Sequence, residues 1–284
     1  MFSLVHRRNN KESRITDVGV TFADPKTGKF KLLTPEISQQ IQHNLGSDIR
    51  VVLDEPAIRT TSVKYLKRAN KRTVDWARRS KEEFLKLHNL SEKEFNDSKI
   101  KRPLLCAVIQ GGNNKDLRKE NAQELIEIGF DIYGFGGGLP EKNEKSWREE
   151  GLKGIDPEQI RFLADLIPKD KIRYGLGIGT PDDLKYASEA GWDIFDTVLP
   201  TRNARHGYLY MKKGEGDRDY KTYSVMHIKN ERYKFDESPI NPDSKIQELR
   251  TTSRAYLRYL FKINEMSGKR LATLNNLEFY SSLL

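Results

Sequence analysis

The segment Trp192–Gly207 reads W-D-I-F-D-T-V-L-P-T-R-N-A-R-H-G and brings an acid and two guanidinium groups close together in the chain. Asp196 stands in an apolar run, where the end of a strand can aim a carboxylate into a pocket. Arg202 and Arg205 follow with a spacing of three, which lets both face one backbone from a loop after the strand, and guanidinium groups bind phosphates through paired hydrogen bonds. The segment therefore combines an acid with an anion-binding pair.

Asp196 belongs to the last of five short apolar runs that predict β-strands. The runs cover residues 50–53, 104–109, 132–135, 173–178 and 194–199. Helical patterns lie between them, such as 116–128 before Gly129 and 181–190 before Gly191. Strands that alternate with helices predict a parallel sheet with crossover helices, so we expect the α/β class.

Polar or glycine-rich elements follow each predicted strand. They are Asp54-Glu55, Gln110-Gly-Gly112, Gly136-Gly-Gly138, Gly179-Thr-Pro181 and Asp196 itself. In a (β/α)₈ barrel the active site is assembled at the carboxyl ends of the strands, so we expect these elements to converge on one pocket. Five strands are too few for a closed barrel, and an open arc would leave two edges for a partner chain to cover.

The remaining segments predict simpler elements. Alternating apolar residues in 18–22 and 30–32, joined by turn residues 24–28, predict a β-hairpin. Thr34 and Pro35 predict the start of a helix that ends near Gly46. Two polar stretches, 88–103 and 213–221, are expected to be surface insertions.

Composition limits the class of protein. The net charge of +9 favours a polyanion as partner. The single cysteine, Cys106, lies in an apolar run, which predicts a buried thiol and excludes both a disulfide framework and a cysteine-rich metal site. No stretch reaches the roughly 20 apolar residues of a membrane span, and the first residues lack the order of a signal peptide, so we expect a cytoplasmic protein without a membrane partner.

The segment 195–207 resembles the F-D-x-V-L-P-T-R-x-x-R-x-G motif of the tRNA-guanine transglycosylases, or queuine tRNA-ribosyltransferases. Further matches to that family occur in order along almost the whole chain. They are Gly19-Val-Thr-Phe22, Gly46-Ser-Asp-Ile49, Asp54-Glu55, Val108-Ile-Gln-Gly-Gly112, Gly177-Ile-Gly-Thr-Pro-Asp-Asp183 and Ser253-Arg-Ala-Tyr-Leu257. The resemblance implies one partial (β/α)₈ TIM-barrel domain over 1–284, with a C-terminal subdomain from about 208 to 284.

The resemblance implies that Asp196 is the nucleophile, which attacks the ribose anomeric carbon, expels guanine and leaves a covalent intermediate. A carboxylate suits an oxocarbenium-like transition state. Asp54 would accept hydrogen bonds from the ring N–H and the exocyclic amine of the base. The alternative interpretation of each aspartate is a cap on the next turn or helix.

Other family positions complete the implied base site. Gln110, Gly136 and Gly137 would contact the base, and Tyr174 and Leu176 would enclose it, although ordinary barrel packing is the alternative for the last two. Arg202 and Arg205 would contact the tRNA. A second basic group lies on a predicted helix, where a solvated face and an RNA-binding surface are both open interpretations. Its members are Lys64, Lys67, Arg68, Lys71, Arg72, Arg78, Arg79 and Lys81.

Two family features are absent from the sequence. The zinc ligands, a C-x-C-x-x-C loop and a histidine, are replaced, so no zinc or other cofactor is expected. The corresponding residues are Ser244, Ile246, Leu249 and Asn275. The motif T-D-S-G-G-[FY]-Q, whose aspartate is the family's general acid/base, would precede Met1, so a second polypeptide or a homodimer is expected to complete the barrel.

The leading hypothesis is a pentosyltransferase that replaces guanine in tRNA, at the wobble position, by a 7-deazaguanine such as a queuine precursor. Two alternatives stay open. The replaced zinc ligands and the unusual Gly138-Leu139-Pro140 loop are compatible with a transglycosylase that modifies DNA. A non-catalytic RNA-binding subunit or fragment would explain the missing T-D-S-G-G motif, but not the presence of Asp196 and Asp54.

Overall fold

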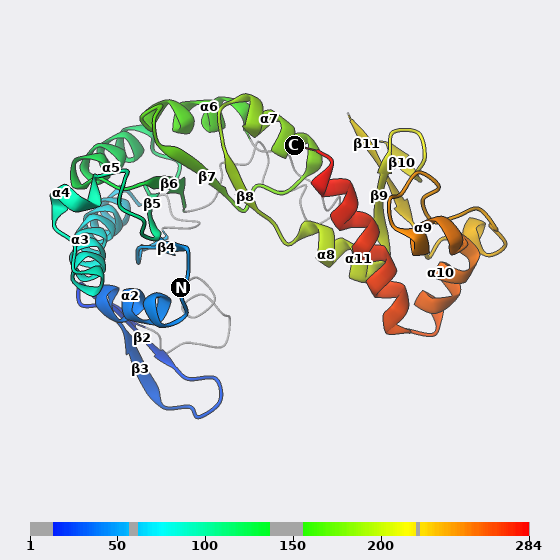
Figure 1. Cartoon of the computed structure of the whole chain (residues 1–284), viewed down its shortest axis with the longest axis horizontal. Helices are drawn as coiled ribbons and strands as arrows, with labels where there is room; N and C mark the ends of the chain where they lie inside the picture. The colour runs from blue at the N-terminus through cyan, green and yellow to red at the C-terminus, as the bar shows by residue number, and fades with distance from the viewer. Residues whose placement is uncertain (1–13, 57–61, 137–155, 220–221, 284) are drawn as a thin grey trace. The chain divides into compact units, whose positions relative to one another are not determined.

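The computed structural model describes residues 14–56, 62–136, 156–219 and 222–283. The described chain forms two compact units (Figure 1). Unit 1 contains residues 14–136, 156–176 and 191–194, and unit 2 contains residues 177–190 and 195–283, each within the described ranges. Each unit has its own arrangement of helices and strands.

Unit 1 begins with a small antiparallel sheet of β1 (Arg14–Ile15), β2 (Val20–Ala23) and β3 (Phe30–Leu33). The predicted hairpin is confirmed: Asp24 Oδ1 accepts hydrogen bonds from the backbone N–H groups of Lys26 and Thr27. Helix α2 (Pro35–Asn44) follows, and the Thr34 hydroxyl accepts from Ile37 N–H as the predicted cap.

The main sheet is parallel, with the strand order β4-β5-β6-β7-β8. Its strands are β4 (Ile49–Val51), β5 (Leu104–Ile109), β6 (Ile132–Phe135), β7 (Ile172–Leu176) and β8 (Ile194–Asp196). Helices α3 (Val63–His88), α5 (Lys115–Ile128), α6 (Pro157–Leu166) and α7 (Pro181–Glu189) connect consecutive strands. This β/α order confirms the predicted α/β class and matches an incomplete TIM-type barrel.

The strand register explains which side chains share a face. Val51 pairs with Cys106, Ile109 with Phe135 and Gly134 with Tyr174.

Cys106 is fully buried, and burial raises the pKa of its thiol to about 12, as expected for a structural cysteine.

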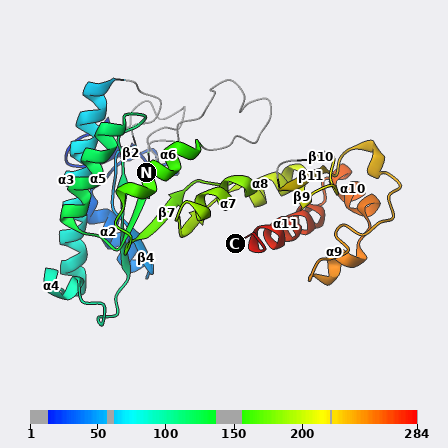
Figure 2. The same cartoon turned by 90° about the horizontal axis from the view of Figure 1, so that it is seen from above.

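Helices α3 and α5 pack side by side on unit 1 (Figure 1, Figure 2). Asn70 donates its side-chain amide to Leu117 O over 2.8 Å, which ties the two helices together. The predicted insertion 88–103 contains a short helix, α4 (Glu92–Phe95), with a Ser91–Glu94 capping box. Most of this insertion is exposed, but Phe95 is buried.

Two predictions near Asp196 were wrong. The run 194–199 was expected to be one strand, but β8 ends at Asp196 and helix α8 (Leu199–His206) begins soon after it. Thr197 Oγ1 accepts from Leu199 N–H, and Pro200 suits the first helical turn, so local chemistry favours the helix. The residues after this strand therefore form a helix where a loop was predicted.

Unit 2 contains an antiparallel sheet in the order β10-β11-β9, formed by β9 (Tyr208–Lys212), β10 (Arg218–Asp219) and β11 (Tyr223–His227). A 3-10 turn, η1 (Glu231–Tyr233), and helices α9 (Gln247–Thr251), α10 (Arg254–Lys262) and α11 (Met266–Ser281) follow. Helix α11 packs against α8 and β9 (Figure 1). Asn276 fixes this packing, because its amide donates to Pro200 O and Tyr208 O and accepts from Tyr210 N–H.

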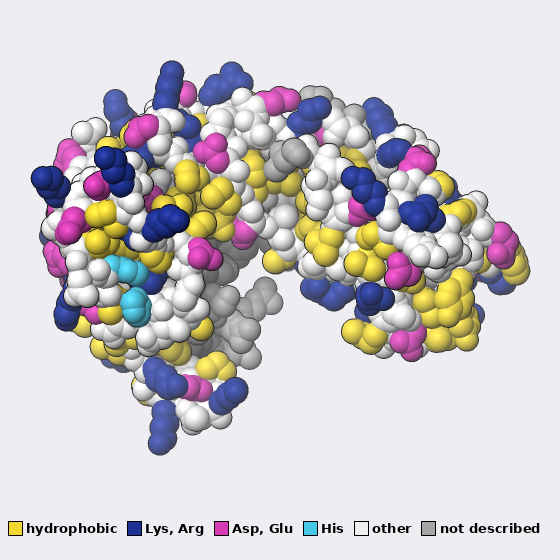
Figure 3. All heavy atoms as spheres, in the orientation of Figure 1, with side chains coloured by type: hydrophobic (Ala, Val, Ile, Leu, Met, Phe, Trp, Pro, Cys, Tyr) yellow, Lys and Arg dark blue, Asp and Glu magenta, His cyan; other side chains and the backbone are white. Residues whose placement is uncertain are grey.

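None of the helices in the described ranges has the length and apolar composition that crossing a membrane requires. Lys and Arg side chains are scattered among Asp and Glu side chains on the face drawn in Figure 3. The net charge of +9 is therefore not gathered into one large field on that face.

Candidate active site

Asp54 and Gln110 meet in unit 1 at the carboxyl ends of β4 and β5. Gln110 donates through Nε2 to Asp54 Oδ2 over 2.5 Å. The backbone N–H of Gln110 is itself fixed, because it donates to Asn121 Oδ1 over 2.8 Å. The structure therefore brings two of the sequence-predicted base-binding residues into direct contact.

Desolvation is the main cause of an unusual pKa at Asp54. Burial raises the pKa of this carboxyl to about 6, and the hydrogen bond from Gln110 opposes the shift without cancelling it. Gln110 is fully buried, and its Oε1 has no hydrogen-bond partner among the described residues. The two oxygens of the Asp54 carboxylate can accept adjacent N–H donors from a ligand.

Gly136 leaves space for the Gln110 side chain. A Cβ built on Gly136 would lie 2.2 Å from Gln110 Nε2 and 2.9 Å from Val108 Cγ1, both too close for real atoms. The observed position of Gln110 therefore requires a glycine at position 136. Gly137, which was predicted with it, lies outside the described residues.

Tyr174 and Leu176 project from the same face of β7, because they are two residues apart on one strand. A Cβ on Gly134 would lie 2.9 Å from Leu176 Cδ1, so Leu176 shares the sheet face from which Gly134 and Gly136 would project side chains. Both side chains are half-buried. The face of unit 1 that carries Asp54 and Gln110 therefore also carries Leu176.

Arg118 supports this region and was not identified from the sequence. Its guanidinium donates to Ile109 O, Gly112 O and Gly136 O over 3.1, 2.8 and 3.0 Å, so it joins the ends of β5 and β6. It is 1% exposed, and desolvation lowers its pKa to about 10. The signal in the sequence is that Arg118 falls among the buried positions of helix α5, where an arginine is unusual.

Asp196 is exposed at the end of β8, in unit 2. Its Oδ1 accepts a hydrogen bond from Gly177 N–H over 3.0 Å. Gly177 adopts a positive φ of 73°, a conformation that favours glycine. The hydrogen bond from Gly177 fixes one carboxylate oxygen, and the Asp196 side chain remains exposed to solvent.

The loop that holds Asp196 is fixed by the C-terminal helix of the same unit. Tyr280, on α11, donates its hydroxyl to Gly179 O over 2.7 Å. Burial is the main cause that raises the pKa of this hydroxyl, so it remains a hydrogen-bond donor at neutral pH. Tyr280 was also missed by sequence reasoning, since a C-terminal tyrosine carries no local signal for this contact.

Arg202 and Arg205 are both exposed on α8. They were predicted in a loop, and this was wrong. The helix nevertheless places both arginines on one side, as expected, since residues three apart lie on the same side of a helix. Neither side chain forms an ion pair with a described carboxylate, so both are available to an anion.

The second basic group on α3 divides into two sets. Three of its members are committed to carboxylates: Arg72 to Glu55 and Asp17, Arg79 to Glu36, and Lys81 to Glu92. The others are exposed and form no ion pair with a described carboxylate. They are Lys64, Lys67, Arg68, Lys71 and Arg78.

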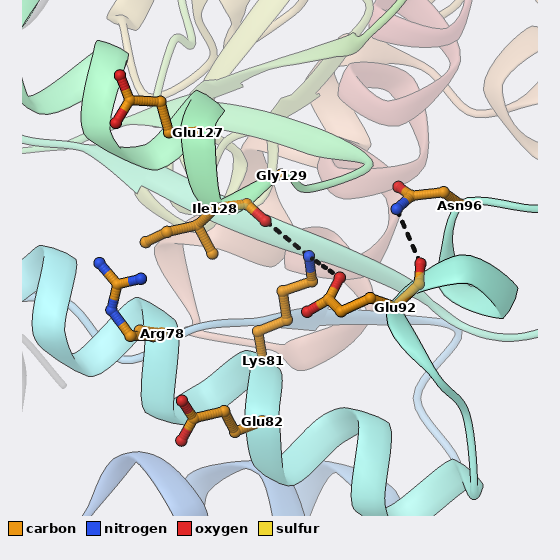
Figure 4. A pocket seen from close by; sticks show the side chains of 8 residues that line it. All are labelled: Arg78, Lys81, Glu82, Glu92, Asn96, Glu127, Ile128 and Gly129. Atoms are coloured by element: carbon orange, nitrogen blue, oxygen red, sulfur yellow. Dashed lines mark hydrogen bonds and ion pairs between the residues drawn. The ribbon is translucent and has the colours of Figure 1, made fainter.

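A pocket on unit 1 lies where α3 meets α4 and the end of α5 (Figure 4). Its lining residues are Arg78, Lys81, Glu82, Glu92, Asn96, Glu127, Ile128 and Gly129. Lys81 Nζ donates to Ile128 O over 2.6 Å and pairs with Glu92 Oε2 at 2.7 Å (Figure 4). The pocket contains none of the predicted catalytic or base-binding residues, although Arg78 and Lys81 belong to the second basic group. Lys81 caps the carboxyl end of α5 through Ile128 O.

The four positions that replace zinc ligands lack thiolate and imidazole groups and do not fit the metal. Ser244 hydrogen-bonds to the carboxylate of Glu278, and that carboxylate also accepts from Lys245 N–H over 2.6 Å. Asn275 donates to Tyr210 O over 3.0 Å, Leu249 is fully buried, and Ile246 packs against the apolar core of unit 2. Hydrogen bonds and apolar packing therefore hold these four residues in place.

The parallel β/α sheet, with carboxylates at the ends of its strands, defines a protein of the TIM-barrel type. Comparison with known families narrows this class. The family model described as queuine tRNA-ribosyltransferase matches residues 1–284, and the chain belongs to this family.

Individual relatives agree with the family match. The chain is 39% identical to a queuine tRNA-ribosyltransferase of Blochmanniella floridana over 277 residues, which are 97% of this chain and 65% of the relative. It is 37% identical to the one from Hamiltonella defensa over 276 residues, 97% of this chain and 66% of the relative. For Actinobacillus pleuropneumoniae serotype 3 the identity is 35% over 275 residues, 96% of this chain and 64% of the relative. The chain thus spans about 65% of the length of these curated relatives.

Proposed function

We propose that this chain takes part in base exchange on tRNA, in which guanine is replaced by a 7-deazaguanine through a covalent intermediate on Asp196. The observation that carries the proposal is the Asp54–Gln110 pair. The Asp54 carboxylate presents two acceptor oxygens beside the Gln110 amide, and guanine presents two adjacent donors, its ring N1–H and exocyclic amine. Adenine presents a different pattern on that edge and would leave the acceptors unpaired.

The proposed reaction has two displacements. A carboxylate oxygen of Asp196 attacks ribose C1′, the bond from C1′ to guanine N9 breaks, and guanine leaves with the bonding electrons and takes up a proton. The N9 of the incoming 7-deazaguanine then loses its proton and attacks C1′, and the bond to Asp196 breaks. Two inversions at C1′ preserve its configuration, as in retaining glycosidases.

The residues of unit 2 support the first displacement. The hydrogen bond from Gly177 N–H orients the Asp196 carboxylate and stabilises its charged form. Arg202 and Arg205 on one side of α8 supply cations for the phosphates on either side of the target nucleotide. In this proposal these residues position the nucleic acid and the nucleophile.

The incoming base requires a proton acceptor, which the family resemblance assigns to the aspartate of T-D-S-G-G. That motif does not occur in the 284 residues. We therefore propose that the proton acceptor for the incoming base comes from outside these 284 residues. The arrangement corresponds to a reaction step of queuosine biosynthesis if the inserted base is a queuine precursor.

The test is incubation of the purified chain with unmodified tRNA and radiolabelled guanine, with and without a polypeptide that carries T-D-S-G-G. Label in tRNA is the expected result, and dependence on the added polypeptide would locate the proton acceptor there. Label only in duplex DNA, supplied in a parallel reaction, would contradict the tRNA assignment. No label in any reaction, with tRNA still bound, would favour a non-catalytic RNA-binding subunit.

A further inference from the structure

The exposed stripe of α3 has two halves with different charge. With the division placed before Asp75, so that the first half is residues 63–74, the exposed charged residues of the first half are all cations, namely Lys64, Lys67, Arg68 and Lys71, which we call the α3 basic face. In the second half the exposed charges alternate in sign. They are Asp75, Arg78, Glu82 and Lys86. These positions follow the spacings of three and four residues that define one side of a helix.

The α3 basic face does not stabilise the helix that carries it. Lys64 and Arg68, and likewise Lys67 and Lys71, are four residues apart, so their like charges repel along the helix surface. The first turn of α3 contains no acidic residue, and cations near a helix N-terminus oppose the helix dipole. The second half instead places opposite charges four residues apart, as in Arg78 with Glu82 and Glu82 with Lys86.

Elsewhere on α3, most cations are paired with described carboxylates, although Arg78 is not. Arg72 pairs with Glu55 over 2.5 Å and Arg79 with Glu36 over 2.7 Å, whereas no member of the α3 basic face pairs with a described carboxylate. The α3 basic face thus holds four of the 50 Lys and Arg side chains of the chain without a described carboxylate partner. These four exposed cations are therefore available to an external anion.

Contacts within unit 1 fix the α3 basic face close to the base-reading residues. Glu55 directly follows Asp54, and its Oε1 accepts from the Tyr65 hydroxyl over 2.9 Å. The backbone N–H of Glu55 donates to Thr73 Oγ1 over 3.0 Å, and the Glu55 carboxylate accepts from Arg72. Thr73 and Arg72 of α3 therefore also hold Glu55 in place. Arg68 of the α3 basic face lies beside Tyr65, since its guanidinium carbon is 5.4 Å from the centre of the Tyr65 ring.

The geometry points to the α3 basic face as a binding surface for the phosphate backbone of tRNA, next to the position where the target base is read. This inference rests on the proposed function for its choice of partner. Seven residues of helix separate Lys64 from Lys71, a rise of about 10 Å, which allows contacts to more than one phosphate. Lysine and arginine contacts of this kind position the nucleic acid without reading its sequence.

The experiment measures binding of fluorescent tRNA to the purified chain across a series of salt concentrations. The test variant carries Lys64→Gln, Lys67→Gln, Arg68→Gln and Lys71→Gln. We expect an affinity loss on the order of tenfold or more at 0.1 M salt, and a decrease of about 2–3 in the slope of log K against log salt. The control, Arg78→Gln with Lys86→Gln, removes two exposed cations from the second half of α3, half as many as the test variant, and is expected to change the slope by less than about 1.

Thermal unfolding of the same proteins separates binding from folding. The four-fold variant is expected to unfold at the same temperature as the wild type or higher, because like-charge repulsion is removed. An unchanged salt slope, the same slope change in the control variant, or no tRNA binding by the wild type would overturn the inference. Charge-dependent binding to phosphatidylserine vesicles without binding to tRNA would also overturn it.

Failure of the proposed function gives a different result. If exchange of labelled guanine is absent but the salt slope still depends on the α3 basic face, the catalytic proposal fails and the RNA contact stands. If exchange occurs and the four-fold variant binds and reacts like the wild type, the catalytic proposal stands and the RNA contact fails.

Discussion

Gln110 donates its side-chain amide to Asp54, with 2.5 Å between Nε2 and Oδ2, although the two residues follow different strands of the parallel sheet. The contact holds a carboxylate with a raised pKa against a buried amide whose Oε1 is unpaired among the described residues. Unit 1 thus buries the Asp54 carboxyl and the Gln110 amide away from water, which lowers the free energy of unfolding. Buried polar groups with shifted pKa values are typical of binding sites.

The pKa of Asp54, about 6 in the folded chain against 3.8 as its ordinary value, makes stability depend on pH. Between these values the folded state binds more protons than the unfolded state, so the free energy of unfolding falls as the pH rises through this window. The loss is on the order of 3 kcal/mol. Asp54→Asn should remove it, so the variant should match the wild type near pH 4 and exceed its stability at pH 8 in urea unfolding.

The control for this pH dependence is Asp24→Asn. Lys31 and the turn backbone lower the pKa of Asp24 to about 2, so its contribution is lost only as the pH falls toward that value. Asp24→Asn should leave the slope of stability between pH 5 and 8 unchanged. A wild-type stability that is flat over this range would disprove the raised pKa of Asp54.

Gly136→Ala should displace Gln110, because the added Cβ would lie 2.2 Å from Nε2. We expect a loss of about 1–3 kcal/mol in the free energy of unfolding, together with weaker guanine binding. Chemical denaturation measures the first effect. In a Gln110→Ala background the same glycine substitution should cost less, and equal costs in both backgrounds would show that the predicted clash does not occur.

Asp196→Asn should abolish incorporation of labelled guanine and leave tRNA binding nearly unchanged, because the amide cannot displace guanine while the arginines of α8 remain. Trapping of the covalent tRNA complex on a denaturing gel is a second readout and should fail in the variant. Undiminished exchange by Asp196→Asn would remove this residue from the mechanism.

Arg202→Gln combined with Arg205→Gln should weaken tRNA binding and reduce the slope of log K against log salt by about 1–2. The reason is that both guanidinium groups are exposed on one side of α8 and lack a described carboxylate partner. Lys185→Gln with Lys262→Gln removes the same charge from exposed positions in unit 2 and serves as the control. Equal effects of the two double variants would indicate attraction by net charge rather than specific contacts.

Unit 2 should keep its thermal stability in the presence of a metal chelator, because the positions that match zinc ligands carry no metal-binding groups. Glu278→Ala should lower the free energy of unfolding by about 1–3 kcal/mol, since it leaves the Ser244 hydroxyl and the Lys245 N–H without an acceptor. Glu237→Ala, at an exposed position in the same unit, should change it little. A chelator-dependent drop in melting temperature would contradict the prediction of a metal-free fold.

Several parts of this protein were predictable from the sequence because their causes are local. Strand β5 has the bounds predicted from its apolar run, since such a run between polar segments identifies a buried strand. The cap at Thr34 and the helix end at Gly129 were also predicted, because caps depend on the residue itself and its immediate neighbours. The site motifs identified Asp54, Gln110 and Asp196 as residues at strand ends.

Other features depend on residues that are distant in the chain, and only the tertiary structure decided them. Eight basic residues on one predicted helix looked equivalent, yet Arg72, Arg79 and Lys81 meet carboxylates from other elements and the α3 basic face does not. Arg118 and Glu278 acquire their roles through carbonyls and a hydroxyl that distant segments supply. The sequence determined which chemical groups stand at the ends of which elements, and packing decided which were neutralised, since burial and pairing are properties of three-dimensional neighbours.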